Sequence, residues 1–147
     1  MASTSDLPVI FENRVRWKEV DRQDVVFYGE YYTYQDETQV EYFRKLGYRY
    51  EDMEANGWTT HIVHSELDYK QPARYEDVIE NCMRVSSIGK SSVTMEYAAY
   101  RGEDGALLVE GEVVHAIVDD DTGEAIPVPE DFRDAVVEFQ EVPPEFV

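Results

Sequence analysis

Residues 15–47 read VRWKEVDRQDVVFYGEYYTYQDETQVEYFRKLG, and the fold prediction starts from this stretch. Its second half, residues 30–46, contains no glycine or proline and places Tyr34 and Tyr42 on one stripe of a helical period. Gly47 follows directly, as glycine commonly does after the last residue of a helix. The pattern therefore predicts a helix over residues 30–46.

Strand patterns lie on both sides of this helix. Before it, residues 9–20 alternate in part, with Val15 and Trp17 on the same side. After it, apolar and polar residues alternate between tight turns at residues 89–90 and 102–105. The predicted strands are residues 59–69, 77–88, 91–101 and 107–118. Shorter segments are predicted at 50–55 and 130–139 as helix, and at 124–128 as a piece at an edge or terminus.

Tight turns between consecutive strands indicate antiparallel pairing. The one long helix must bury its apolar stripe, and the sheet is the available partner. The prediction is an α+β fold in which a curved antiparallel sheet wraps one helix, in a single domain over residues 1–147 with its core at about 9–130. One face or edge of such a sheet stays uncovered, which predicts self-association.

The composition excludes several classes of protein. The chain has 147 residues, 43% of them hydrophobic, so it is not simply disordered. No apolar run approaches the ~18 residues that cross a bilayer, and residues 1–6 do not resemble a secretory signal. Cys82 is the single cysteine, which excludes an internal disulfide and a cysteine-based zinc site. These features predict a cytoplasmic protein without a membrane partner.

The net charge is −19, from 13 basic and 32 acidic residues. Such a field repels polyanions, so no nucleic-acid partner is expected. The acidity has two interpretations: a surface for a basic partner, or a solvated carboxylate coat suited to concentrated salt, where self-repulsion is screened. Acidic residues scattered along the whole chain, with 9 Arg and only 4 Lys, favour the second and suggest a halophile.

Isolated residues that could carry chemistry have ordinary interpretations. His61 and His64 lie three apart on a predicted strand, so they should face opposite sides and form no metal site. His115 lies in an apolar strand and is expected in the core. Cys82 is expected to be a buried, inert thiol. Residues 119–121 are three aspartates before a glycine, without the spacing of a calcium loop, and should form a solvated turn.

Residues 19–31 are more informative. Carboxylates follow a strand directly and precede a helix N-terminus, where backbone N–H groups are free and carry partial positive charge. This arrangement suits a carboxylate that attacks, or activates water, while backbone N–H groups hold an oxyanion. Acidic loops are common in this chain, so the spacing alone is a weak indication.

Particular motifs extend the argument. They are 19–21 (EVD), 25–28 (VVFY), Tyr31, 46–47 (LG), 69–77 (YKQPARYED) and 88–92 (IGKSS). In kind and order these resemble the hotdog-fold acyl-CoA thioesterases of the 4-hydroxybenzoyl-CoA thioesterase type. The resemblance covers about residues 9–130 and implies hydrolysis of an acyl-CoA thioester to a free acid and CoA. It implies no metal or redox cofactor, since CoA enters only as part of the substrate.

The resemblance also implies site residues. Asp21 matches the catalytic aspartate, which acts as nucleophile or general base on the thioester carbonyl. Tyr28 matches the position whose backbone N–H polarises that carbonyl, and Glu19 matches an acidic residue with a structural role. The site is expected at the interface of a homodimer, or of a homotetramer built from dimers.

CoA carries several phosphate charges, so the acidic chain must supply a local basic patch. The candidates are Arg74, Arg84, Lys90 with Ser91, and Arg101, all near predicted turns or strand ends. In the family, a loop like that at residues 89–91 lies near the nucleotide.

Two departures from the family pattern keep other functions open. Asp24 stands where glycine is usual, and Glu30 stands where asparagine is frequent. A non-catalytic acyl-CoA or lipid-binding protein therefore remains an alternative. A hotdog hydratase or dehydratase is a weaker one, because that class pairs His with Asp near the helix and residues 1–60 contain no histidine.

Overall fold

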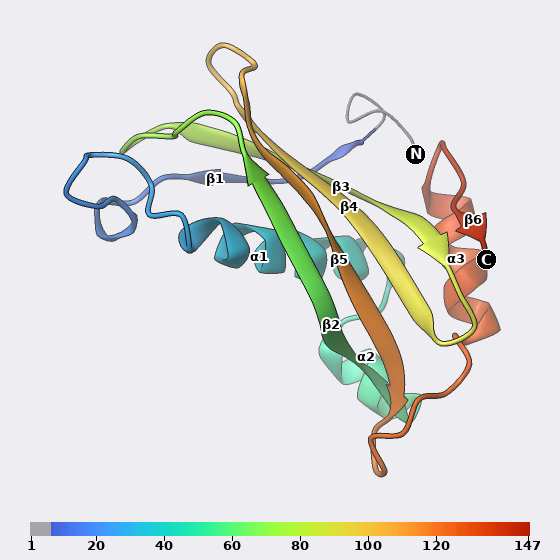
Figure 1. Cartoon of the computed structure of the whole chain (residues 1–147). Coiled ribbons are helices and arrows are strands. Elements are labelled where there is room, and N and C mark those ends of the chain that lie inside the picture. Colours follow the sequence, from blue (N-terminus) through green and yellow to red (C-terminus); the bar gives the residue numbers. More distant parts are fainter. Residues whose placement is uncertain (1–6) are drawn as a thin grey trace.

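The computed structural model describes residues 7–147, which form one curved sheet and three α-helices (Figure 1). The strands follow the order β1-β3-β4-β5-β2, all antiparallel, and the short β6 pairs parallel with β3. The elements are β1 (Val9–Arg14), α1 (Glu30–Leu46), α2 (Tyr50–Ala55), β2 (Trp58–Tyr69), β3 (Val78–Ile88), β4 (Ser92–Arg101), β5 (Leu107–Asp119), α3 (Glu130–Phe139) and β6 (Glu145–Phe146).

Helix α1 lies in the concave face of the sheet, which confirms the predicted α+β architecture (Figure 1). Its bounds are the predicted ones, and Gly47 caps it at φ 86°, a conformation that glycine adopts without steric cost. The buried face of α1 contributes Tyr34 and Tyr42, which the sheet covers. Helix α3 adds Phe132, whose ring packs edge-on to Phe43 of α1.

The strand predicted over residues 9–20 is wrong in its second half. Strand β1 ends at Arg14, and Trp17–Glu19 forms a short 3-10 helix with the Trp17 side chain 71% exposed. The cause is Glu19, whose carboxylate accepts hydrogen bonds from the backbone N–H and the guanidinium of Arg16. These bonds curl the chain away from the extended path that the alternation predicts.

The alternation predicted for residues 59–69 is interrupted by a bulge at Val63. His61 is opposite Ala116 and His64 is opposite Val114, while Val63 has no partner in the β2–β5 ladder. Residues 114 and 116 point to one face of β5, so the two histidines share a face. The prediction that they face opposite sides is therefore wrong.

The expectations for Cys82 and for the turn at residues 119–121 are confirmed. Cys82 is buried, and burial raises the pKa of its thiol to about 11. Asp119 closes a turn by accepting the N–H groups of Asp121 and Thr122. The segment at 124–128 forms only an isolated bridge, between Val118 and Ala125, and β6 was not predicted. None of the helices in residues 7–147 combines the length and apolarity needed to span a bilayer.

His115 is fully buried, as predicted, with its ring 5.7 Å from that of Phe43. Within the described chain neither ring nitrogen has a hydrogen-bond partner, and burial lowers the pKa of this imidazole to about 4. Because an unfolded histidine titrates near its ordinary value of about 6.5, the unfolded state binds more protons below that pH. Folding stability is therefore lost as pH falls from about 6.5 toward 4.

We expect wild type to lose about 2 kcal/mol of unfolding free energy from this group between pH 7.5 and 5. Urea unfolding of wild type and His115→Phe at both pH values measures the effect, because the difference between the two proteins cancels the titration of carboxylates. His61→Ala, an exposed histidine, serves as the control. Equal pH dependence in wild type and His115→Phe would contradict the assignment.

Candidate active site

Residues 20–26 form a tight loop between the 3-10 helix and α1. A bridge between Val20 and Val26 closes the loop, and the Asp21 N–H donates to the Val25 carbonyl at 2.9 Å. The Asp21 Oδ1 accepts the Gln23 N–H at 2.8 Å, and the residue is half-buried. Hydrogen bonds thus hold both the backbone and one carboxylate oxygen of Asp21.

Asp24 has φ 62° and is exposed. This left-handed conformation explains why glycine suits the position, and aspartate is among the few other residues that adopt it with little strain. Its exposure means that the carboxylate is solvated, so it is not packed against Asp21 as a second buried charge.

The N-terminal end of α1 presents the backbone N–H of Tyr28. The Phe27 carbonyl accepts the Glu30 N–H at 2.9 Å and so points along the helix. A trans peptide holds its C=O and N–H in opposite directions, so the Tyr28 N–H points away from the helix. Within residues 7–147 no acceptor pairs with it. This donor is available to a ligand, at the positive end of the helix dipole.

A cavity of about 280 Å³ opens at the same end of α1. The Tyr69 hydroxyl donates to the Tyr28 carbonyl at 3.0 Å, and the Tyr69 ring packs edge-on to those of Tyr28 and Tyr31. The cavity is therefore largely aromatic. Its lining residues are Val26, Tyr28, Tyr31, Tyr69, Lys70, Gln71 and Pro72.

Ala73 joins the loop, the helix and the β2–β3 connection. Its N–H donates to the Tyr31 hydroxyl at 3.2 Å, and its carbonyl accepts the Val26 N–H at 2.8 Å. The residue is completely buried, so these bonds are shielded from water. Through Ala73 the residue 69–77 motif positions the cavity beside the Asp21 loop.

Glu19 is buried at the base of the loop, where its Oε1 accepts the Tyr34 hydroxyl of α1 at 2.9 Å. Burial alone would raise the pKa of this carboxyl, but the hydrogen bonds from Arg16 and Tyr34 outweigh it and the pKa is lowered. Glu19 therefore remains charged and ties the loop to the helix, which is the structural role expected of it.

A family model described as the thioesterase-like superfamily matches residues 15–136 of the chain. The chain belongs to the thioesterase-like superfamily. The match includes the Asp21 loop, α1 and the four long strands, and the predicted hotdog fold is confirmed.

Individual relatives of this superfamily are distant. A protein of Aquifex aeolicus, provisionally named an esterase, is 26% identical over 125 residues, 85% of this chain and 94% of its own. A 1,4-dihydroxy-2-naphthoyl-CoA thioesterase from Synechocystis superposes with a TM-score of 0.80 at 16% identity, over 88% of this chain and 95% of that one. A DHNA-CoA thioesterase from Staphylococcus aureus gives 0.78 at 24% identity, over 85% of each chain. At these identities the solved structures show the shared fold.

The predicted basic residues do not all lie at the cavity. Arg74 is exposed in the β2–β3 connection, next to Ala73 and hence at the Asp21 end of the sheet. Lys90 and Ser91 form the β3–β4 turn at the other end of the sheet (Figure 1). Arg101 is held by Asp77 and Asp104 and donates to the Pro72 carbonyl. Of the five candidates, Arg74 and Arg101 therefore lie at the Asp21 end of the sheet, and Arg101 is already paired with two carboxylates.

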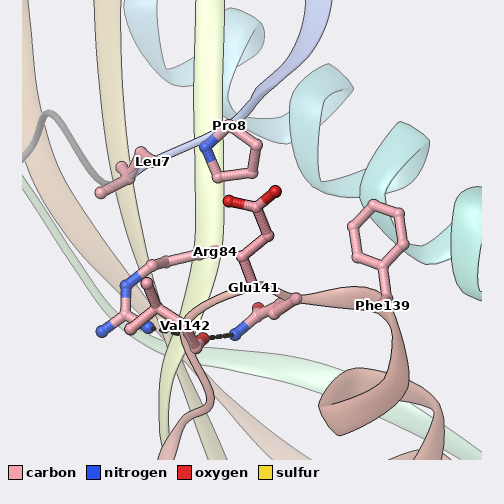
Figure 2. A pocket seen from close by; sticks show the side chains of 7 residues that line it. Leu7, Pro8, Arg84, Phe139, Glu141 and Val142 are labelled. Carbon is pink, nitrogen blue, oxygen red and sulfur yellow. Dashed lines mark hydrogen bonds between the residues drawn. The ribbon is translucent and has the colours of Figure 1, made fainter.

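Arg84 was expected near a turn or strand end, and this placement is wrong. It lies in the middle of β3, with its side chain 6% exposed and its Nε 3.6 Å from a carboxylate oxygen of Glu96. Figure 2 shows it beside a separate cavity of about 430 Å³, together with Leu7, Pro8 and residues 139–142. Its guanidinium is held by Glu96 and by the carbonyls of Val85 and Val142, none of which lines the cavity beside the Asp21 loop.

Several lining residues were not recognised as such from the sequence. Tyr31, Tyr69 and Lys70 all occur in the motifs that carry the resemblance, so their position was indicated. Their role as cavity walls depends on the meeting of α1 with the β2–β3 connection. That contact joins segments 42 residues apart, as the Tyr31–Ala73 bond shows, and periodicity does not report it.

Proposed function

We propose that the protein hydrolyses acyl-CoA thioesters to a free carboxylic acid and CoA. The observation that carries the proposal is the Tyr28 N–H, which has no acceptor among residues 7–147 and lies beside the Asp21 loop and an aromatic cavity, in a chain of the thioesterase-like superfamily. One backbone donor aimed at a developing oxyanion typically contributes about 3 kcal/mol to catalysis.

The Tyr28 N–H polarises the thioester carbonyl and holds the negative charge that develops on its oxygen. Asp21 either takes a proton from water, whose oxygen bonds to the carbonyl carbon, or attacks that carbon itself to give an anhydride that water then opens. In both routes the C–S bond breaks and the CoA thiolate leaves and is protonated. No metal or redox group is required for these steps.

The CoA phosphates need positive charge near this end of the sheet. Arg74 is exposed there, and Lys70 lines the cavity with its Nζ 3.8 Å from Glu110. Solvent would separate each of these cations from a CoA phosphate, and salt screens such an attraction. Apolar contacts with pantetheine are therefore expected to supply much of the affinity in high salt.

A homodimer would complete this patch. Strand β2 is a long edge of the sheet, with Ile62 and Val63 more than half exposed. Antiparallel pairing of two β2 strands places the Trp58 end of one beside the Tyr69 end of the other. The β3–β4 turn lies at the Trp58 end, so Lys90 of the partner subunit would approach this chain's cavity. A homotetramer built from two such dimers, and a cytoplasmic location, complete the proposal.

The acyl group is proposed to be aromatic. Rings of Tyr28, Tyr31 and Tyr69 meet at the cavity, and edge-on packing of aromatic rings is favourable. Both solved relatives named above act, by their names, on CoA thioesters of that class.

A thiol-release assay at molar KCl tests the activity, with 1,4-dihydroxy-2-naphthoyl-CoA, benzoyl-CoA and octanoyl-CoA as substrates. We expect turnover of the aromatic thioesters in preference to octanoyl-CoA. If acyl-CoA raises the melting temperature but no thioester releases thiol, the chain is the non-catalytic binder. Faster turnover of octanoyl-CoA would overturn the aromatic assignment alone.

A further inference from the structure

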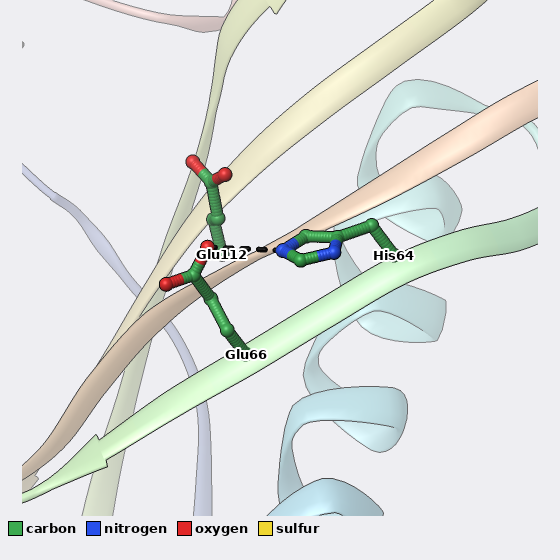
Figure 3. Close-up of side chains that lie close together, drawn as sticks. All are labelled: His64, Glu66 and Glu112. Atoms are coloured by element: carbon green, nitrogen blue, oxygen red, sulfur yellow. Dashed lines mark hydrogen bonds and ion pairs between the residues drawn. The ribbon is translucent and has the colours of Figure 1, made fainter.

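Three potential metal ligands meet on the face of the sheet opposite α1 (Figure 3). His64 and Glu66 come from β2 and Glu112 comes from β5, with ligand atoms all within 4.8 Å of one another. The His64 Nε2 lies 3.0 Å from Oε1 of Glu66. Ser65, between them, hydrogen-bonds Gln35 of α1, so its two neighbours point to the other side of the sheet.

The bulge at Val63 creates this arrangement. With regular alternation from His61, His64 would point toward α1. The unpaired residue shifts the phase, so that His64 joins Glu66 on the outer face, opposite Val114 in the ladder. A conformational irregularity thus brings an imidazole to two carboxylates.

Arg84 of β3 neutralises Glu96 at one end of a row of carboxylates on this face, but within the described residues no lysine or arginine is paired with Glu66 or Glu112. Glu66 lies directly opposite Glu112 in the β2–β5 ladder, and Glu112 lies directly opposite Glu96 in the β4–β5 ladder. Like charges at such positions destabilise a sheet. The Glu96 side chain is 9% exposed, and within the described chain its Oε1 has no hydrogen-bond partner.

We propose that His64, Glu66 and Glu112 bind a divalent transition-metal ion, with Zn²⁺ as the fitting probe. One imidazole nitrogen and two carboxylate oxygens form a donor set that Zn²⁺ accepts, with water at the remaining position. Two ligands about 2.1 Å from one ion are at most about 4.2 Å apart, so small side-chain rotations suffice. The ion would join the edge strand β2 to β5 and neutralise the Glu66–Glu112 pair.

The site is accessible and lies apart from the proposed active site. The side chains of His64 and Glu66 are 53% and 55% exposed, so an ion can enter without opening the fold. The Asp21 loop is tied to α1 through Glu19 and to Ala73 through Val26, whereas the three ligands lie on β2 and β5. The inference therefore does not depend on the proposed hydrolysis.

Calorimetric titration of tag-free, chelator-treated protein with ZnCl2 tests the proposal. We expect one ion per chain and a higher melting temperature with Zn²⁺. Loss of even an outer-shell partner costs a metal site about 10–100-fold in affinity, so His64→Ala and Glu112→Gln should each weaken binding by about tenfold or more. His61→Ala is the matched control, because it removes an exposed histidine from the same face and should leave affinity unchanged.

Ring resonances in the NMR spectrum give a second readout, because the chain has only 3 histidines. Zn²⁺ should shift the His64 ring signals, while those of buried His115 stay in place. The proposal is overturned if His64→Ala binds Zn²⁺ as tightly as wild type, or if His61→Ala is the variant that loses Zn²⁺ affinity. Failure of wild type to bind below millimolar Zn²⁺ would equally exclude it.

Discussion

Replacing Asp21 by asparagine is expected to lower kcat for acyl-CoA hydrolysis by about 100-fold or more. Asparagine can neither take a proton from water nor attack the thioester as an anion. It does retain an Oδ1, which can still accept the Gln23 N–H, so the loop should keep its shape. Steady-state thiol release, with melting temperature as a check on folding, measures the effect.

Asp24→Asn is the matched control for Asp21→Asn. It removes the same charge from the same loop, and asparagine tolerates the left-handed conformation of this position at least as well as aspartate. Because Asp24 is exposed, its replacement should change kcat less than about threefold. If Asp21→Asn retains the wild-type rate, the catalytic assignment is wrong even though the family is right. A similar loss in both variants would indicate an effect of loop charge.

The fold was largely predictable because its decisive features are local. The helix over residues 30–46 lacks glycine and proline and ends at Gly47. Its bounds can therefore be predicted from residues that are adjacent in the sequence. Strands β3, β4 and β5 are separated by tight turns. These turns predict antiparallel pairing of consecutive strands without knowledge of distant contacts. Burial of Cys82 and His115 follows in the same way from apolar neighbours.

Two of the features that were missed, the face of His64 and the burial of Arg84, depend on contacts between strands. Ile62 and Val63 are both β-branched, so composition does not reveal which of them leaves the ladder, and the bulge reverses the predicted face of His64. Arg84 has the polarity of a surface residue, but its partner Glu96 lies opposite it in the β3–β4 ladder. Its burial therefore appears only when the register is known.

The candidate site likewise combines local features, which the sequence predicts, with features that depend on distant contacts. Asp21 and Tyr28 lie seven residues apart in one continuous loop and helix start, so a linear motif can identify them. The cavity beside them needs the β2–β3 connection, and the phosphate patch needs residues from the far end of the sheet. Within one chain Lys90 cannot serve this site, so its expected role in phosphate binding depends on the proposed dimer.

Replacing Glu19 by alanine is expected to lower the free energy of unfolding by about 2–4 kcal/mol. The substitution removes the acceptor of the buried Tyr34 hydroxyl and of the Arg16 backbone N–H. Tyr34 is 2% exposed, so its hydroxyl would lose its protein acceptor at a buried position. Urea unfolding at neutral pH measures the loss, and exposed Glu54→Ala, expected within about 0.5 kcal/mol of wild type, is the control.

Glu19→Gln separates hydrogen bonding from charge in this network. Glutamine can still accept from Tyr34 and from the Arg16 backbone, but it loses the charged pairing with the Arg16 guanidinium, which is 61% exposed. Exposed ion pairs contribute little, so this variant should lose only about 1 kcal/mol. Because Glu19 also anchors the start of the Asp21 loop, Glu19→Ala should reduce kcat while Glu19→Gln largely retains it. A loss of stability as large for glutamine as for alanine would mean that the charge, and not the buried acceptor, holds the loop to α1.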